Sequence, residues 1–379
     1  MKRIYLDHAA TTPLDNEILE TMLPYFTEEF GNPNSPHGAG RKAMAAVDNA
    51  RDSLVALLNA KPSEIYFTSG GTEADNWALL GGAYAQREFG KNHIIVSSIE
   101  HHAVITAAAR LEKEGFSVTY LPVNKGGRVE VSSLKEALTD DTGLVAVMLA
   151  NNETGALQEI KALAEIAHAN GSLFFTDGVQ AAPYIPLDVK DLGVDMLSIS
   201  GHKFYGPKGV GALYIKSGVK VWAHALGGEQ ERGLRGGTLN VPAIVGLSAA
   251  YQKNHATMYE TNEKLTALRT LFLGELSTLG GISVNGENTL PAIINLRIEG
   301  ISNVDVLYKL DLCGVSAAAG SACASSSIQP SHVLTAMGLT EKEANECLRF
   351  SLGKHTTEEE ILRATMILKE IVTKLREEK

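Results

Sequence analysis

The segment between residues 64 and 216 constrains the fold most, because it alternates short β-branched, apolar runs with amphipathic helical stretches. This alternation is typical of βαβ units, which build a mostly parallel sheet with helices on both faces. We therefore predict an α/β fold with a mostly parallel seven-stranded sheet. Ligands of such sheets bind at the carboxyl ends of the strands, so residues that follow strands are the first site candidates. The candidate strands lie at residues 64–68, 93–97, 117–121, 144–149, 172–176, 196–199 and 211–215.

A second, smaller unit is predicted beyond this sheet. After Pro242 a long helical pattern leads into a region with a further strand and two further helices. These segments are a helix to about residue 279, a strand at residues 292–298, and helices from Val304 and Thr357. With 379 residues the chain is long enough for two domains. The predicted domains are a large one at residues 14–257 and a smaller α+β one made of residues 1–13 and 258–379.

Charge and hydropathy exclude several classes of function. The 34 basic and 44 acidic residues give a net charge of -10 without a dense Lys/Arg block, which disfavours direct nucleic-acid binding. The longest strongly apolar run has seven residues, at 144–150, whereas a membrane helix needs about 20. Asp7 and His8 stand where a signal peptide would be apolar. We expect no membrane span and a cytoplasmic location.

The three cysteines are Cys313, Cys323 and Cys347, with no C-x-x-C pair and no histidine at zinc-finger spacing. This pattern argues against a disulfide framework and a bound metal. Cys323 lies in residues 314–327, where 12 of 14 residues are Gly, Ala or Ser, and such a composition predicts a mobile loop. Cys323 is therefore the candidate reactive thiol. We expect Cys313 and Cys347 to be small buried residues.

The turn after the first candidate strand could bind a phosphate. Residues 69–72 read Ser-Gly-Gly-Thr and precede a helical segment that begins at Glu73. Glycines let the backbone approach an anion, and a helix N-terminus offers free N–H groups and a positive dipole. The alternative is a plain glycine turn in which Thr72 caps the helix.

An acid and a lysine follow two later strands. Asp177 ends the strand at 172–176, and Lys203 follows the strand at 196–199, close to Ser200 and His202. Alone, the acid could be a simple cap and the lysine a solvated loop residue. Opposite a phosphate cradle, however, they form the pair that pyridoxal phosphate requires. The lysine attaches the cofactor, and the acid keeps its pyridine nitrogen protonated.

Two further post-strand residues are candidates with plain alternatives. His101 follows the strand at 93–97 and could stack on a cofactor ring and move protons near neutral pH. It could equally be a capping or exposed histidine. Asn152 follows the strand at 144–149 and could donate to cofactor or substrate, although an ordinary turn explains it almost as well.

Taken together, these motifs resemble the cysteine desulfurases of the iron-sulfur-cluster type, in the class V branch of fold-type I pyridoxal-phosphate enzymes. The resemblance covers nearly the whole chain, and it rests on the joint order of the motifs. Besides Thr72, His101, Asn152, Asp177 and Lys203, the matching segments are residues 5–13, 30–33, 227–233, 235–238, 320–323 and 349–353.

The resemblance implies a cofactor site for pyridoxal 5'-phosphate. It makes Lys203 the residue that binds the cofactor covalently, Asp177 the partner of the pyridine nitrogen and His101 the stacked acid/base. Gln180 would donate to the ring hydroxyl. The phosphate would be held by Gly71, Thr72, Ser200 and His202, and by Thr238 from the other subunit, which implies a homodimer.

The resemblance also implies the reaction. Asn152 and Arg349 would bind the substrate carboxylate, for which a planar guanidinium is well suited. Cys323, on a long loop at about 314–332, would take sulfur from L-cysteine, giving L-alanine and a persulfide. The sulfur would pass to an acceptor protein, either a cluster scaffold or a tRNA-thiolation enzyme. The alternatives are a small-molecule aminotransferase, a selenocysteine lyase of the same branch, or a non-catalytic paralogue.

Overall fold

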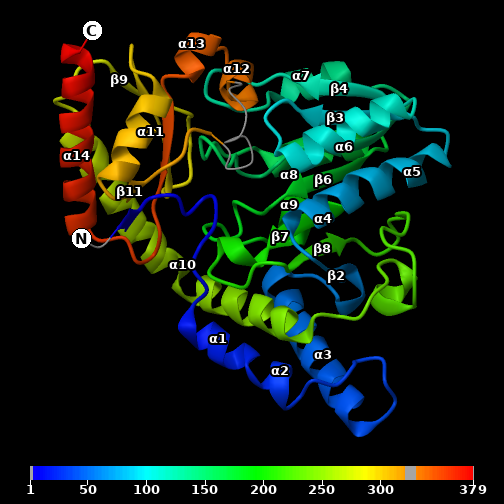
Figure 1. The fold of residues 1–379 in the computed structure, drawn as a ribbon. Helices are drawn as coiled ribbons and strands as arrows, with labels where there is room; N and C mark the ends of the chain where they lie inside the picture. The colour runs from blue at the N-terminus through cyan, green and yellow to red at the C-terminus, as the bar shows by residue number, and fades with distance from the viewer. Residues whose placement is uncertain (1–2, 321–329, 379) are drawn as a thin grey trace.

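The computed structural model describes residues 3–320 and 330–378, and its main element is a seven-stranded sheet (Figure 1). The strands are β2 (Ile65–Thr68), β3 (His93–Ser97), β4 (Ser117–Leu121), β5 (Thr142–Ala146), β6 (Leu173–Asp177), β7 (Met196–Ser200) and β8 (Gly211–Ile215). Their order is β2-β8-β7-β6-β5-β3-β4. Within this sheet only β8 runs antiparallel to its neighbours, so the other strands share one direction. The predicted mostly parallel seven-stranded sheet is confirmed.

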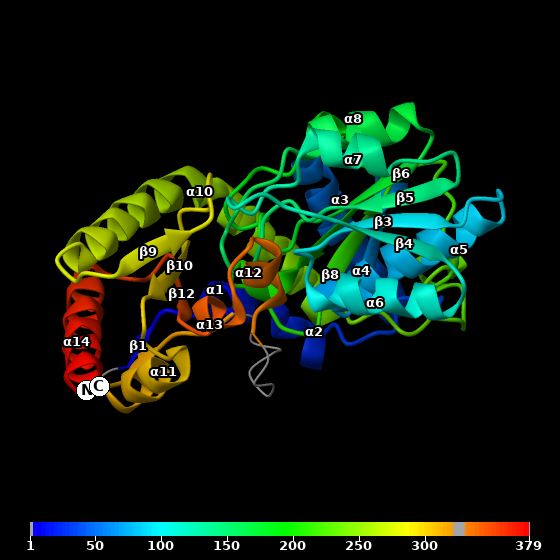
Figure 2. The same cartoon turned by 90° about the horizontal axis from the view of Figure 1, so that it is seen from above.

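Helices cover both faces of this sheet (Figure 2). Successive strand residues point to opposite faces, and their buried side chains divide between two apolar clusters. Ile94 and Phe175 pack with one set of helices, whereas Ile95 and Phe174 pack with the other. Burial on both faces explains why the central strands are nearly continuous apolar runs. The first set is α4 (Gly71–Asn76), α5 (Gly82–Arg87) and α6 (His102–Lys113), and the second is α7 (Val131–Ala137) and α8 (Ile160–Ala169).

A smaller antiparallel sheet, in the order β12-β10-β9, forms the second unit. Its strands are β9 (Ile282–Asn285), β10 (Ile293–Ile298) and β12 (Cys347–Ser351), and its helices are α11 (Asn303–Leu312), α12 (His332–Ala336), α13 (Glu341–Ala344) and α14 (Glu358–Glu377). Sequence reasoning located β10, α11 and α14 but not β9 or β12. The placement of a domain boundary after residue 257 stays a prediction.

The long helix α10 (Val241–Leu276) runs from the main sheet to the smaller unit (Figure 1). Its N-cap is Asn240, which accepts a hydrogen bond from the backbone N–H of Ala243. Its first half packs on α3 (Gly38–Leu58) and its second half on α14. Although α10 has 36 residues, no helix among the described residues is both long and apolar enough to cross a membrane.

The N-terminal segment joins the two units. β1 (Ile4–Tyr5) pairs in parallel with β11 (Val315–Ser316), and Asp7 bridges to Ser351 at the end of β12. The chain then crosses to the large unit and forms two short helices. These and the remaining short elements are α1 (Asn16–Met22), α2 (Pro24–Thr27), α9 (Val189–Leu192), the 3-10 helices η1 (Pro62–Glu64), η3 (Gly201–Lys203) and η4 (Gln230–Gly233), and the π-helix η2 (Trp77–Gly81).

The cysteines differ in their surroundings. Cys347 is buried in β12, as predicted, and burial raises the pKa of its thiol to about 11. The prediction for Cys313 is wrong, because this residue is exposed. Cys313 caps the C-terminus of α11 just before Gly314, whose φ of 79° turns the chain toward buried Val315. Cys323 lies outside the described residues.

Asp15, the N-cap of α1, contacts two distant segments of the chain. We expect Asp15→Asn to lower the free energy of unfolding by about 1 kcal/mol. Its carboxylate accepts hydrogen bonds from Lys253 Nζ at 3.0 Å and Lys354 Nζ at 2.7 Å. Partial burial raises the pKa of Asp15, but these two lysines outweigh it and lower the pKa to about 2. The stabilisation is therefore complete above the ordinary pKa of 3.8 and disappears as the pH falls toward about 2.

Urea titrations of wild type and Asp15→Asn at several pH values measure this difference. Glu17→Gln is the matched control, since Glu17 contacts the same Lys253 at 2.9 Å but its side chain is 77% exposed. We expect that control to change stability by less than about 0.5 kcal/mol. An equal effect of both substitutions at neutral pH would contradict the assignment.

Candidate active site

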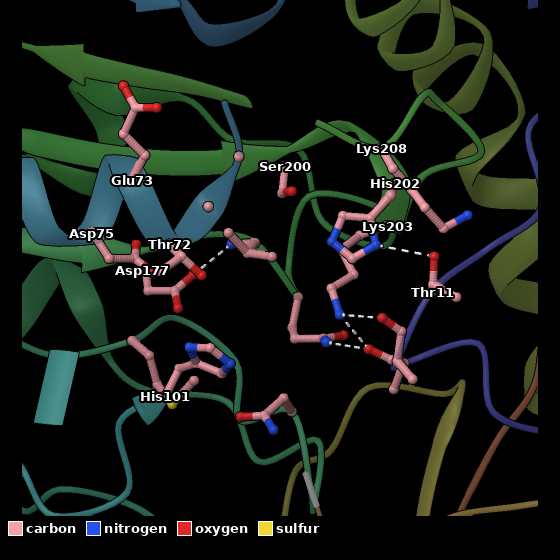
Figure 3. A pocket seen from close by; sticks show the side chains of 18 of the residues that line it. Thr11, Thr72, Glu73, Asp75, His101, Asp177, Ser200, His202, Lys203 and Lys208 are labelled. Carbon is pink, nitrogen blue, oxygen red and sulfur yellow. Dashed lines mark hydrogen bonds between the residues drawn. The ribbon is translucent and has the colours of Figure 1, made fainter. Parts of the chain in front are cut away.

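A pocket of about 430 Å³ lies at the carboxyl edge of the main sheet. Its walls come from the segments that follow β2, β3, β5, β6 and β7, together with the N-terminal segment and one residue of β12 (Figure 3). The structure thus brings together ten of the predicted site residues: Gly71, Thr72, His101, Asn152, Asp177, Gln180, Ser200, His202, Lys203 and Arg349.

The turn after β2 forms one wall of this pocket. Gly70 is the N-cap of α4 and has a φ of 155°, a conformation that residues with a Cβ rarely adopt. The N-cap is this glycine, which has no side chain to cap the helix, so the idea that Thr72 is the N-cap is wrong, and Thr72 lies in the first turn. Ser200 and His202 line the same pocket from the neighbouring β7 and η3. The helix N-terminus thus keeps backbone N–H groups for a ligand anion.

Lys203 is held by backbone carbonyl groups. Its Nζ donates to the carbonyl oxygens of Ala9 at 2.5 Å and Ala10 at 2.9 Å (Figure 3). A lysine fixed in this way inside a pocket is not the solvated loop residue that its sequence context also allowed. Gln180 Nε2 donates to the same Ala9 oxygen at 2.8 Å.

Asp177 lies at the end of β6 and is only 4% exposed. One carboxylate oxygen accepts a hydrogen bond from the backbone N–H of Val179 at 2.8 Å. Burial is the largest effect and raises the pKa of Asp177, although this N–H and the charge of Lys203 act in the opposite direction. A carboxylate at the base of a pocket that also contains an amine can hold a protonated ring nitrogen.

His101 caps a helix, as one interpretation of its sequence context allowed, and it also lines the pocket. Its Nδ1 accepts a hydrogen bond from the backbone N–H of Ala103 at 3.1 Å and so caps α6, while the ring lines the pocket. This bond places the hydrogen of the neutral ring on Nε2. Burial first, and then the charge of Lys203, lower the pKa of His101 to about 4.

The N-terminal segment contributes contacts that sequence reasoning did not assign. Besides the two alanine carbonyls, Thr11 Oγ1 lies 3.1 Å from His202 Nδ1, and Thr12 Oγ1 donates to the His202 carbonyl at 2.8 Å. The only signal for this was the segment's place in the resemblance, at residues 5–13. Glu73, Asp75, Met148, Val179 and Lys208 also line the pocket without having been predicted.

Arg349 brings a cation from the smaller unit into the pocket. It is 1% exposed, donates from Nη2 to Asp7 at 2.7 Å and donates from Nη1 to the carbonyl of Asn152 at 2.9 Å. Its Nε is buried and lacks a hydrogen-bond partner among the described residues. The guanidinium therefore retains a donor that a ligand carboxylate could satisfy.

Two predicted residues are not placed in the pocket. Thr238 is exposed and does not line it, and its predicted role in a second subunit is untested in this single chain. Cys323 lies outside the described residues. Among residues 3–320 and 330–378, no cluster of histidine, cysteine or acidic side chains could hold a metal ion.

The chemistry of these groups fits pyridoxal 5'-phosphate. Its aldehyde requires an amine, its pyridine nitrogen a carboxylate, and its phosphate a set of N–H and O–H donors. Lys203, Asp177 and the uncapped turn at Gly70 provide these three features around one pocket.

The chain belongs to the class-V aminotransferases: the family model described as Aminotransferase class-V matches residues 4–363. The cysteine desulfurase IscS of Clostridium botulinum (strain Hall) is 48% identical over 381 residues, covering 99% of this chain and 96% of the relative. The resemblance inferred from the motifs is therefore confirmed.

Solved structures agree with this assignment. A NifS-like protein superposes with a TM-score of 0.93 at 36% identity, covering 98% of this chain and 100% of that one. SspA in complex with cysteine superposes with a TM-score of 0.82 at 37% identity, covering 93% and 99% of the two chains. The predicted fold class is confirmed by these neighbours.

We expect the His101 ring to stay neutral from about pH 8 down to about pH 5, because burial and Lys203 both disfavour its charged form. Lys203→Met should raise the pKa of His101 only part of the way to its ordinary value of 6.5, since burial is the larger cause. Nitrogen-15 NMR of the imidazole groups measures this, with His101→Gln to assign the signal. A wild-type midpoint near 6.5 would contradict the expected neutral state.

Proposed function

We propose that this protein is a cysteine desulfurase that uses pyridoxal 5'-phosphate to convert L-cysteine into L-alanine and a persulfide on Cys323. The observation that carries the proposal is the placement of Lys203, Asp177 and Arg349 around one pocket. An amine, a buried acid and a buried guanidinium are the groups that an amino-acid substrate and this cofactor require. The relatives named cysteine desulfurase support the choice of substrate, as does SspA with its bound cysteine.

The cofactor, when bound, would act as an electron sink for the bond that breaks at the substrate α carbon. Asp177 would hold its pyridine nitrogen, Gln180 its ring hydroxyl, and His101 would stack against its ring. The phosphate donors would be Gly71, Thr72, Ser200 and His202, with Thr238 from a second subunit. These roles follow the family resemblance, and the pocket supports all of them except that of Thr238.

The chain's own residues would then carry out the reaction in two stages. Arg349 and Asn152 bind the substrate carboxylate, and Lys203 takes the proton from the α carbon. The Cys323 thiolate attacks the substrate sulfur, so that a sulfur–sulfur bond forms as the carbon–sulfur bond breaks. His101 is the candidate for managing the protons of substrate and product: it is neutral near pH 7, and because its Nδ1 accepts from Ala103 N–H, it has an Nε2–H to donate.

The proposal also covers the location of the enzyme, its oligomeric state and its sulfur acceptor. We infer that it works as a cytoplasmic homodimer and passes its sulfur to an acceptor protein, which is a cluster scaffold or a tRNA-thiolation enzyme. The dimer follows from the family resemblance, in which Thr238 reaches the phosphate of the other subunit; Thr238 is exposed in this chain.

Lys203→Ala should abolish the visible absorbance of covalently bound pyridoxal 5'-phosphate and reduce turnover by at least about 10³-fold, since catalysis needs the amine. Absorbance spectra and alanine production measure these losses. Lys208→Ala is the matched control, because this neighbouring lysine lines the pocket but is exposed. Normal alanine production by Lys203→Ala would refute the assignment of the covalent lysine.

Cys323→Ser should still bind cysteine but release no alanine and carry no protein-bound sulfur, because a serine hydroxyl cannot replace the thiolate. The measurement uses sulfur-labelled cysteine and quantifies alanine and peptide-bound label without reductant. Cys313→Ser is the control for a second accessible thiol, since Cys313 is exposed.

The same measurement separates the alternatives. An aminotransferase would be indifferent to Cys323→Ser and would consume a keto acid. Alanine release by this variant at the wild-type rate, or absence of label on the wild-type peptide that contains Cys323, would contradict the desulfurase proposal.

A further inference from the structure

Three carboxyl groups are buried close to one another, and two of them, Asp75 and Asp177, line the pocket. Asp75 of α4 is 1% exposed, Glu100 is fully buried, and Asp177 of β6 is 4% exposed. Asp177 has an assigned partner in the cofactor, whereas the proposed reaction uses neither Asp75 nor Glu100. Buried carboxylates in one low-dielectric region cannot all be ionised, because each added negative charge raises the cost of the others.

Ser198 lies between two of these carboxyl groups. In the parallel register of β6 and β7, Ser198 is the direct partner of Asp177, so their side chains share one face of the sheet. On that face the Ser198 Oγ lies 2.5 Å from Asp75 Oδ1. Ser198 also lowers the pKa of Asp177. The three side chains therefore lie in a row from α4 through β7 to β6.

The other charged and titratable groups around Asp177 each favour one protonation state. Lys203 favours the ionised form of Asp177, and His101 is held neutral by its low pKa. Burial raises the pKa of Glu100 to about 8, although Ser97 Oγ and the Met148 N–H both donate to it. Burial and the proximity of Asp177 raise the pKa of Asp75 well above its usual range. At neutral pH Asp177 is thus the acid of this cluster with a neighbouring cation to favour its charge.

We propose that Asp75 is a positioning residue which, as a neutral acid, donates its proton to Ser198 Oγ and so directs the Ser198 hydroxyl hydrogen toward Asp177. A protonated carboxyl is a donor and a serine hydroxyl both donates and accepts, so the chain can run in this one direction. The arrangement rests on the proposed function, since it keeps the negative charge of the cluster on the residue that would hold the pyridine nitrogen. Two acids in one site thereby take different protonation states.

Two variants test the direction of the chain. In Asp75→Asn the amide can still donate to Ser198 Oγ but cannot ionise, so cofactor retention should resemble wild type at every pH. In Ser198→Ala the hydroxyl that lowers the pKa of Asp177 is lost, so this pKa rises. Its charge then disappears at a higher pH as the solution is acidified. We expect the pH at which half of the pyridoxal 5'-phosphate is lost on dialysis to rise by about one unit.

Ser98→Ala is the matched control, because Ser98 Oγ is also buried near the site but has no hydrogen-bond partner among the described residues. It should leave the retention profile unchanged. Equal profiles for Ser198→Ala and Ser98→Ala would overturn the proposal, as would loss of cofactor by Asp75→Asn at neutral pH.

Infrared difference spectroscopy of wild type against Asp75→Asn tests the protonation state directly. We expect the wild type to show the carbonyl band of a protonated carboxyl group that the variant lacks. Carboxylate bands in its place would mean that Asp75 is ionised and would overturn the proposal. The measurement can be made with and without pyridoxal 5'-phosphate, so its failure is distinguishable from a failure of the proposed function.

Discussion

The common direction of the strands in the main sheet is the constraint on which the site depends. Parallel strands expose the carboxyl ends of their backbones at one edge, so each strand delivers its following residue to the same place. The reversed strand β8 fits this rule, because it begins at that edge and Gly209, just before it, also lines the pocket. Five segments far apart in sequence thereby meet at one pocket: those after β2, β3, β5, β6 and β7.

The N-terminal segment forms the part of the pocket wall that the sheet edge does not provide. It pairs with the smaller unit through β1 and Asp7, and it accepts the hydrogen bonds of Lys203 through two backbone carbonyls. Carbonyl oxygens accept hydrogen bonds from the amine, so they fix the orientation of the Lys203 side chain. Asp7 also pairs with Arg349, whose charge would otherwise be buried without an anion. One segment therefore fixes the two cations that the proposed reaction requires.

Sequence reasoning succeeded where a single residue type or a hydrophobic pattern is enough to predict the structure. The strands of the main sheet follow from apolar runs, and Asp177 and Lys203 follow from their places after strands. Contacts made by backbone atoms, such as the Ala9 carbonyl that binds Lys203, leave no such mark, and the strand β12 depends on pairing with the distant β10. Asp75 was missed because a charged residue in a helix usually faces solvent. The burial of Cys313 was wrongly predicted, because the exposure of a residue at a helix end depends on the direction in which the chain leaves the helix.

The electrostatics of the pocket explain why so many of its titratable groups are neutral. Burial lowers the pKa of His101 and of His202 to about 4 and raises that of Glu100 to about 8, so each favours its uncharged form near pH 7. A pocket lined by neutral donors binds a phosphate through directed hydrogen bonds, and the arriving negative charge would in turn raise the pKa of His202. Asp177 is different, because burial raises its pKa only to about 6 and the neighbouring Lys203 favours its charged form. Charge in this cavity is thus retained on Lys203 and Asp177, which the proposed chemistry uses, while the surrounding neutral groups provide directed hydrogen bonds.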